Sequence, residues 1–192
     1  MTAAAPRLGL DTATPFLSLA LWWPDTGRVA RAAWRLDREL AGELAVRVDA
    51  FVAEHGIAAA DLGGIGVGVG PGSYTGARVG VAWATAAARA LGVPLVGGDT
   101  LAARAAACIR PGERGAVATE ARRGEAWTET WRLAADGRPL AGEDRRRVAL
   151  RDLPADAAAS LDRAPDAALH ARRVDAPDAS PPVVRYEVAG KR

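Results

Sequence analysis

The first part of the chain passes from short apolar runs to a helical spacing of apolar positions. The apolar runs are separated by turns that contain Pro15 and Gly27. They predict an antiparallel meander of three strands, over residues 7–11, 16–23 and 28–36. An amphipathic helix over about 41–55 is expected next, because apolar residues recur there every three or four positions.

The stretch from residue 65 to residue 108 alternates between short apolar runs and Ala-rich segments. The short runs predict buried strands at 65–70 and 94–98. The Ala-rich segments predict one helix that ends at Leu91 and another over 101–108. A helix between two strands makes a crossover, so these later strands are expected to be parallel. The pattern therefore predicts an α/β protein with a mixed sheet.

The pattern changes near Pro111 and weakens further along the chain. Residues 116–121 and 125–133 predict two strands joined by a turn at 122–124, with a second hairpin turn at Asp136 and Gly137. A short helix over 153–161 and a final strand over 183–188 are also expected.

Composition and charge narrow the classes of protein to which the chain can belong. It has 192 residues, a formal net charge of +2 and 49% apolar residues, as in ordinary globular proteins. A dedicated nucleic-acid-binding protein usually carries a basic stripe with aromatic residues between. The dense basic cluster at 145–147 is instead interpreted as a solvated turn or strand edge. Cys108 is expected to be a buried, inert thiol. No apolar run reaches about 18 residues and no leader pattern is seen, so a cytoplasmic location without membrane contact is expected.

Asp11 ends the first predicted strand and is followed by a turn with two hydroxyl residues, Thr12 and Thr14. A carboxylate in this position can bind Mg²⁺ while turn N–H groups and hydroxyls bind phosphate. The same residues are typical of an Asx turn, in which the carboxylate accepts a hydrogen bond from the nearby backbone. The local sequence favours the Asx turn but leaves both interpretations open.

A second turn, from Gly70 to Arg78, joins the strand at 65–70 to the following helix. Its sequence is Gly-Pro-Gly-Ser-Tyr-Thr-Gly-Ala-Arg. The N–H groups at the helix start attract anions, which Arg78 can reach. Equally, Gly70 and Gly72 permit unusual backbone angles while Ser73 caps the helix, which would make the turn a structural corner. The turn lacks the residues of a nucleotide P-loop.

Small residues recur every four positions along the helix after this turn, at Gly76, Gly80 and Ala84. Such a stripe lets another helix approach closely, from within the chain or from a second subunit. Trp83 beside it is a plausible interface anchor. Core packing explains the stripe equally well.

Residues for catalysis are few. The two histidines, His55 and His170, lack partners at metal-ligand spacing, and Ser73 has no identifiable base. We therefore expect no catalytic residues and no metal site.

Three segments of the chain together resemble the bacterial TsaB family, also called YeaZ. They are 8–14 (Leu-Gly-Leu-Asp-Thr-Ala-Thr), 66–80, which contains the Gly-Pro-Gly-Ser-Tyr-Thr-Gly-x-Arg string, and 94–101. The second half departs from the family pattern. It has Glu120-Ala121-Arg122 where the family usually has Asp-Ala-Arg, and its 182–185 segment lacks the Tyr of the C-terminal signature.

The resemblance implies an actin- and sugar-kinase-like (ASKHA) ATPase fold with two α/β lobes. The first would be a ribonuclease-H-like lobe at 1–108, and the second a smaller, degenerate and shortened lobe at 109–192. The family is the non-catalytic partner in the transfer of threonylcarbamoyl to the adenosine beside the tRNA anticodon. This implies a TsaD-type catalytic subunit and a TsaE-type ATPase as partners, with tRNA contacted only through the complex.

The resemblance also implies site residues. A vestigial nucleotide or anion site would contain Asp11, Thr12, Thr14, Gly70, Gly72, Ser73, Thr75 and Arg78. A partner surface, used also for a homodimer, would contain Leu44, Val48, Phe51, Gly76, Gly80, Trp83, Ala84 and Ala87. Ala13 replaces the usual Gly of the phosphate-binding turn, so no intrinsic cofactor is expected, although ATP or ADP with Mg²⁺ could bind at an interface shared within the complex. The alternative is a small ATPase or kinase-like phosphotransferase that uses Asp11 and the 70–78 turn.

Overall fold

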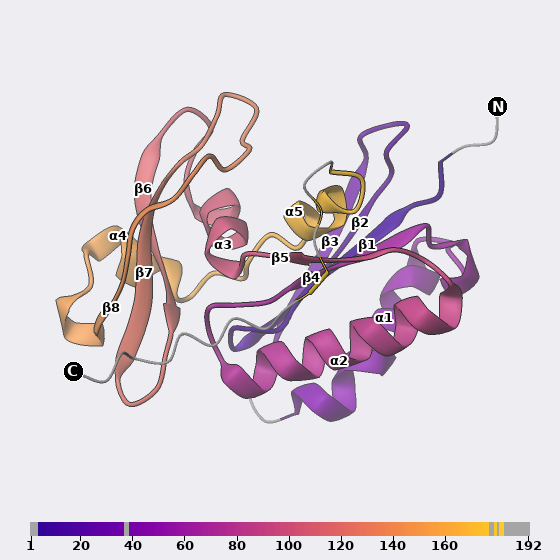
Figure 1. Cartoon of the computed structure of the whole chain (residues 1–192), viewed down its shortest axis with the longest axis horizontal. Helices are drawn as coiled ribbons and strands as arrows, with labels where there is room; N and C mark the ends of the chain where they lie inside the picture. Colours follow the sequence, from indigo (N-terminus) through magenta and orange to yellow (C-terminus); the bar gives the residue numbers. More distant parts are fainter. Residues whose placement is uncertain (1–3, 37–38, 177–178, 180, 183–192) are drawn as a thin grey trace.

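A computed structural model describes residues 4–36, 39–176, 179 and 181–182 (Figure 1). Its first sheet has five strands in the order β3-β2-β1-β4-β5. Strands β1 to β3 are antiparallel, and β4 and β5 join them in parallel. The predicted meander and the predicted parallel strands are both confirmed. Their bounds are β1 (Arg7–Asp11), β2 (Phe16–Trp22), β3 (Val29–Arg35), β4 (Gly64–Gly68) and β5 (Leu95–Gly98).

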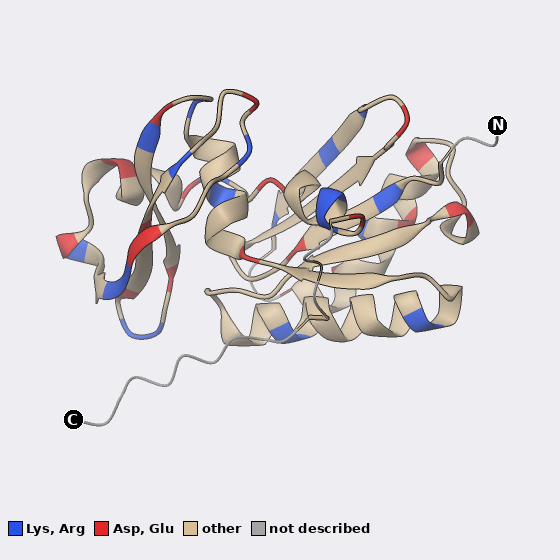
Figure 2. Cartoon of the chain, turned by 45° about the horizontal axis from the view of Figure 1, so that its top comes forward, with Lys and Arg blue, Asp and Glu red and all other residues tan. Residues whose placement is uncertain are grey.

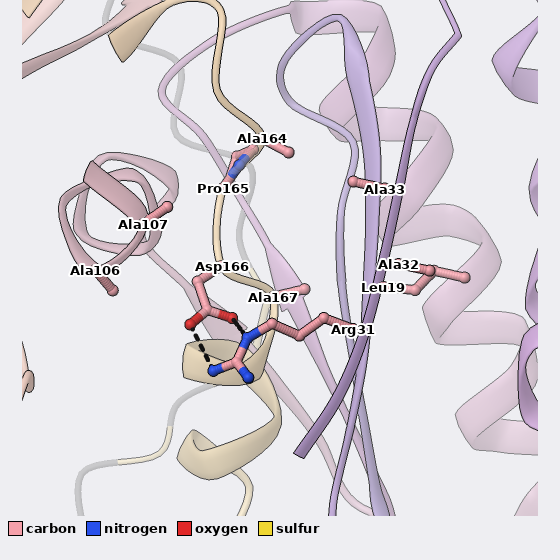
Figure 3. Close-up of a pocket in the computed structure, with 10 residues that line it drawn as sticks. All are labelled: Leu19, Arg31, Ala32, Ala33, Ala106, Ala107, Ala164, Pro165, Asp166 and Ala167. Carbon is pink, nitrogen blue, oxygen red and sulfur yellow. Dashed lines mark hydrogen bonds and ion pairs between the residues drawn. The ribbon is translucent and has the colours of Figure 1, made fainter. Parts of the chain in front are cut away.

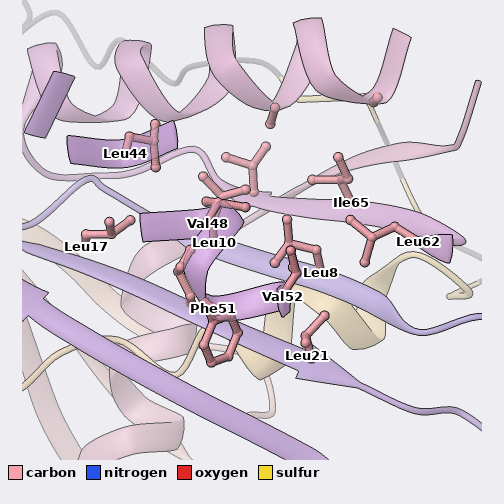
Figure 4. Packing of buried hydrophobic residues seen from close by; sticks show 14 of the residues in the cluster. Leu8, Leu10, Leu17, Leu21, Leu44, Val48, Phe51, Val52, Leu62 and Ile65 are labelled. Carbon is pink, nitrogen blue, oxygen red and sulfur yellow. The ribbon is translucent and has the colours of Figure 1, made fainter. Parts of the chain in front are cut away.

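Two helices, α1 (Leu40–Glu54) and α2 (Tyr74–Leu91), cover one face of this sheet (Figure 1). The apolar stripe of α1 meets branched apolar residues from the strands, such as Leu10 and Ile65 (Figure 4). This is the largest core cluster of the described residues, because the alternating strand positions and the helical stripe face one another.

The opposite face is covered by a short helix, α5 (Ala168–Arg173), which contacts β1, β2, β4 and β5. Glycines allow its backbone to approach the sheet. A Cβ on Gly9 would lie 2.0 Å from the carbonyl oxygen of Ala167, and one on Gly66 would lie 1.9 Å from that of His170. The sequence does not predict this helix, because a segment of only six residues is too short to show the helical spacing of apolar positions.

The second sheet has three antiparallel strands in the order β6-β7-β8, with bounds β6 (Arg114–Glu120), β7 (Glu125–Arg132) and β8 (Glu143–Ala149). The helix α4 (Ala155–Ser160) and the helix α3 (Thr100–Cys108) both pack against β6. Two short 3-10 segments complete the order, η1 (Ala59–Asp61) and η2 (Leu150–Asp152). The strands predicted at 116–121 and 125–133 are confirmed, and so is the short helix within 153–161.

Strand β8 was not predicted, and it contains the 145–147 arginine cluster at the edge of its sheet. The strand expected at 183–188 lies outside the described residues. The division into lobes after residue 108 stays a prediction, although α5 returns from beyond that point to the first sheet. In the part of the chain that the structure describes, no helix is long and apolar enough to cross a membrane.

Candidate functional site

The two turns singled out by the sequence lie against each other. Strands β1 and β4 are parallel neighbours, so the turns that follow them emerge at the same edge of the sheet. The backbone N–H of Ser73 donates to the carbonyl oxygen of Ala13 at 2.7 Å, and the Thr12 hydroxyl donates to that of Gly76 at 2.8 Å. The structure thus joins the two predicted groups of residues into one site.

Asp11 is wholly buried at the centre of this site. Its Oδ1 accepts the N–H of Ala13 at 2.9 Å, which is the Asx turn favoured from the sequence. Its Oδ2 accepts the hydroxyl of Thr100 at 2.8 Å and lies 2.9 Å from Nε2 of His170. The Thr100 hydroxyl in turn accepts the N–H of Gly70 at 3.1 Å. Both carboxylate oxygens therefore have partners from the chain itself.

His170 was not predicted as part of the site, because it lies 159 residues from Asp11 and stands alone in its segment. It projects from α5 and is wholly buried. A Cβ on Gly98 would lie 2.1 Å from its Nδ1, and a Cβ on Gly68 would lie 2.1 Å from Oδ2 of Asp11. The sequence signal for this contact is the presence of glycines at alternate strand positions, such as Gly66 and Gly68, which allow another segment to approach the sheet closely.

The second turn has the features of a structural corner. Gly70 and Gly72 have φ angles of +94° and +157°, and a Cβ on Gly72 would lie 2.0 Å from the carbonyl oxygen of Ala13. The Ser73 hydroxyl accepts the N–H of Gly76 at 3.1 Å and so caps α2. Thr14 is buried and its hydroxyl accepts the N–H of Phe16 at 3.2 Å. Thr75 and Arg78 are exposed on the outer side of the turn.

In the described chain the Asp11 carboxylate is not open to an Mg²⁺-nucleotide. Its side chain has no exposed surface, and its oxygens accept hydrogen bonds from Ala13 and Thr100 and lie against Nε2 of His170. The carbonyl oxygen of Ala13 accepts the N–H of Ser73, so the two turns are hydrogen-bonded to each other.

Known proteins resemble this chain. A family model described as TsaD, tRNA N6-adenosine threonylcarbamoyltransferase, matches residues 36–149. The Escherichia coli (strain K12) tRNA threonylcarbamoyladenosine biosynthesis protein TsaB is 33% identical over 125 residues, which are 64% of this chain and 53% of that protein. The chain belongs to the TsaB/YeaZ family.

Two further proteins are similar to this chain in structure or in sequence. YeaZ from Pseudomonas aeruginosa has a solved structure that matches with a TM-score of 0.67 and 27% identity, over 78% of this chain and 70% of that one. An uncharacterized protein of Mycobacterium tuberculosis (strain H37Rv) is 36% identical over 131 residues, 68% of this chain and 59% of that protein. The fold is therefore the expected ASKHA-like α/β fold. The chain spans little more than half the length of these curated relatives.

The small-residue stripe of α2 packs inside the chain, which corrects its assignment to a partner surface. A Cβ on Gly76 would lie 2.1 Å from the Thr12 carbonyl oxygen, and one on Gly80 would lie 2.1 Å from the Thr12 hydroxyl. Ala84 is wholly buried. Leu44, Val48 and Phe51, also assigned to that surface, are buried in the core, whereas Trp83 and Ala87 are partly buried. The stripe of α2 and the apolar side of α1 therefore both face the core of the described chain.

An ion-pair cluster joins the end of β5 to the second sheet. Arg145 lies 2.6 Å from Asp99 and 2.8 Å from Glu129, and the indole N–H of Trp131 donates to Glu129 at 3.0 Å. Burial raises the pKa of Glu129, which the hydrogen bond from Arg145 opposes. Burial alone would lower the pKa of Arg145, but the hydrogen bonds and charges of Glu129 and Asp99 raise it above its ordinary value. The cluster therefore fixes the two sheets together through charged groups that are mostly shielded from water.

A cavity of about 420 Å³ lies between β3 and the 164–167 segment (Figure 3). Its walls are mostly alanine methyl groups, together with Leu19 and Pro165. Arg31 and Asp166 form a paired contact across it at 2.9 and 3.0 Å. No sequence-predicted site residue lines it. Within the described ranges, no group of three or more His, Cys, Asp or Glu side chains could hold a metal ion.

Proposed function

We propose that this chain is a non-catalytic scaffold and activating subunit of the assembly that transfers a threonylcarbamoyl group to the adenosine next to the tRNA anticodon. Two comparisons support the pathway: the matching family model is described as a tRNA threonylcarbamoyltransferase, and the Escherichia coli relative is named for threonylcarbamoyladenosine biosynthesis. The expected location is the cytoplasm, where tRNA is modified.

The occupied carboxylate of Asp11 is the observation that carries the non-catalytic part of the proposal. A phosphotransferase that used Asp11 would need its carboxylate within reach of a bound metal ion, yet the side chain is wholly buried and bonded to Ala13, Thr100 and His170. The proposed partners are therefore a TsaD-type subunit that supplies the catalytic residues and a TsaE-type ATPase. If ATP or ADP with Mg²⁺ binds, it would do so at an interface shared with these partners and not in the Asp11 turn.

The partner surface that we propose is the outer face of α1 and α2, which also serves a homodimer. The side chains there are small and apolar at several positions, among them the exposed Ala50, Ala82 and Ala86. Val46 is 64% exposed, the highest value among the exposed large hydrophobic residues of the described chain. Flat, weakly charged helix faces of this kind suit the close packing of another helix pair.

One test measures threonylcarbamoyladenosine in tRNA from bacteria that lack their own TsaB-type protein and express this chain. Restoration of the modified nucleoside, detected by mass spectrometry of digested tRNA, is expected. An unmodified tRNA pool, despite soluble expression and co-purification with the host TsaD-type subunit, would contradict the activating role.

A second test addresses the partner surface. Val46→Arg is expected to abolish co-purification with the TsaD-type subunit, because a long charged side chain would be buried in the contact. Leu140→Arg is the matched control, since Leu140 is also an exposed large hydrophobic residue, 37% exposed, but follows β7. Equal binding by the wild type and Val46→Arg would overturn this placement.

A third test titrates Mg²⁺-ATP into the isolated chain by calorimetry. No heat of binding is expected, because the Asp11 carboxylate is wholly buried. Micromolar binding with turnover would instead favour an active ATPase or kinase-like phosphotransferase.

A further inference from the structure

Arginines gather around the exposed ring of Tyr74, where the β6–β7 turn meets the start of α2. Tyr74 is 41% exposed. The guanidinium of Arg78 donates to the Tyr74 hydroxyl at 3.0 Å, and its Cζ lies 5.1 Å from the ring centroid. The Cζ of Arg122 lies 5.7 Å from the same centroid. Arg123 follows at the tip of the turn, which is blue in Figure 2. We call these four residues the Tyr74 patch.

The positive charge of the Tyr74 patch is not neutralised by the rest of the described chain. Ten other arginines form ion pairs there, but none involves Arg78, Arg122 or Arg123. The nearest acidic residues in the sequence are accounted for. Glu125 pairs with Arg147 at 3.2 Å, and Glu120 lies two positions after Ala118, on the α4 face of the sheet.

The patch combines two kinds of group. Exposed guanidinium groups bind phosphate through forked N–H donors, and the flat faces of Tyr and Arg can stack on unpaired bases. An acidic protein segment would use the charges but gain little from the exposed ring. The combination is therefore better suited to a phosphodiester backbone with unstacked bases than to an acidic peptide.

We propose that the Tyr74 patch is a direct contact surface for a single-stranded or loop region of tRNA. This inference rests on the proposed function, because that function brings tRNA to the complex. It goes beyond the proposed function, since it assigns an RNA contact to this chain. That contact is built from the start of α2 and from the β6–β7 turn of the second sheet.

The test measures binding of a fluorescent tRNA transcript, by anisotropy, to the full chain alone and to its complex with the TsaD-type subunit. Arg78→Glu/Arg122→Glu is compared with Arg132→Glu/Arg172→Glu. The control pair changes the net charge equally, and both of its arginines are exposed, outside the patch and without ion pairs in the described chain. The first variant is expected to bind at least about 10-fold more weakly at moderate salt. Its slope of log K against log salt is expected to fall by about 1.4, because each single-strand phosphate that an arginine no longer neutralises contributes about 0.7. The control is expected to bind like the wild type.

Tyr74→Leu provides a second readout. Stacking releases no counterions, so this variant is expected to weaken binding several-fold while the salt slope stays unchanged. Circular dichroism of each variant confirms that it remains folded.

Three outcomes would overturn the inference. The first is equal tRNA binding by the wild type and Arg78→Glu/Arg122→Glu, both alone and in the complex. The second is equally weakened binding by the control pair, which would show general electrostatics only. The third is binding of a poly-glutamate peptide as tight as that of tRNA at equal charge concentration, with neither weakened by Tyr74→Leu, which would favour an acidic protein partner. Association with the TsaD-type subunit is measured in parallel, and its retention would leave the proposed function intact if the patch fails.

Discussion

Gly80→Ala tests whether the small-residue stripe of α2 is packed inside the chain. The added Cβ would lie 2.1 Å from the hydroxyl oxygen of Thr12 and 3.3 Å from its Cβ. Thr12 has no exposed surface, and its hydroxyl donates to the carbonyl oxygen of Gly76 at 2.8 Å. The substitution therefore forces a buried side chain to move and breaks its hydrogen bond.

Two opposing effects determine how much Gly80→Ala changes the free energy of unfolding. Replacing Gly by Ala inside a helix stabilises it by about 1 kcal/mol. Overpacking costs about 1–3 kcal/mol, and a buried hydroxyl left without its partner costs about 1–3 kcal/mol more. We expect a net decrease of about 2 kcal/mol in the free energy of unfolding. Gly42→Ala is the matched control, because Gly42 is exposed in α1 and a Cβ there meets nothing within 4 Å. It should stabilise the protein by about 0.5–1 kcal/mol.

The assay is urea unfolding of both variants, followed by tryptophan fluorescence and circular dichroism. Thr12→Ala completes a double-mutant cycle, since it removes the hydroxyl that the new methyl group meets. Gly80→Ala should then cost about 1–2 kcal/mol less than in the wild type. If Gly80→Ala stabilised the chain as much as Gly42→Ala does, the stripe could not be packed against Thr12.

Three further predictions concern polar groups that are wholly or partly shielded from water. Arg145→Ala should lower the free energy of unfolding by about 3 kcal/mol, because it leaves the buried Glu129 without its ion-pair partner. The control Arg114→Ala breaks an exposed pair with Glu143 and should cost under about 1 kcal/mol, so equal destabilisation of the two variants in urea unfolding would contradict this prediction. His170→Ala should lower the free energy of unfolding by about 3 kcal/mol, because it removes a partner of Asp11 and leaves a cavity, whereas His170→Gln keeps a hydrogen-bond donor and should cost less. If His170→Ala left the free energy of unfolding unchanged, Asp11 would need no such partner. Burial raises the pKa of the Cys108 thiol, with Arg104 opposing the rise, so iodoacetamide at about pH 8 should alkylate this thiol in the folded chain more slowly than free cysteine. Unfolding in urea should remove the difference, and equal alkylation rates before unfolding would argue against the raised pKa.

The first sheet could be predicted from the sequence because most of its strands are short apolar runs that begin close after a Gly or Pro. Strand β8 could not, because its Arg145 to Arg147 run lacks apolar alternation and owes its strand conformation to pairing with β7. The helix α5 was missed for a similar reason. Its stability comes from the sheet that it covers and not from its own six residues.

The candidate site was predicted in part. The Asx turn at Asp11 and the Ser73 cap follow from local residue preferences, so the sequence contained them. His170 and Thr100 reach Asp11 from distant segments, and no local pattern encodes that meeting. The sequence left two interpretations of the stripe from Gly76 to Ala84. Small residues allow another segment to approach closely, but they do not determine whether that segment belongs to the same chain or to a second subunit. The Tyr74 patch was hidden likewise, since Arg78 and Arg122 come together only when the two sheets are in place.

The glycine-lined face of the first sheet has a consequence for how the chain folds during synthesis. Strands β1, β4 and β5 are complete once residue 98 has been added, but their second face is covered only by residues 167–174, including Val174. A ribosome must therefore add more than sixty residues while that face, and Asp11 within it, remain open to water. Such an intermediate is prone to aggregation and to capture by chaperones. Substitutions in α5 are thus expected to reduce the yield of soluble protein in cells by more than the loss of stability of the finished fold alone would explain.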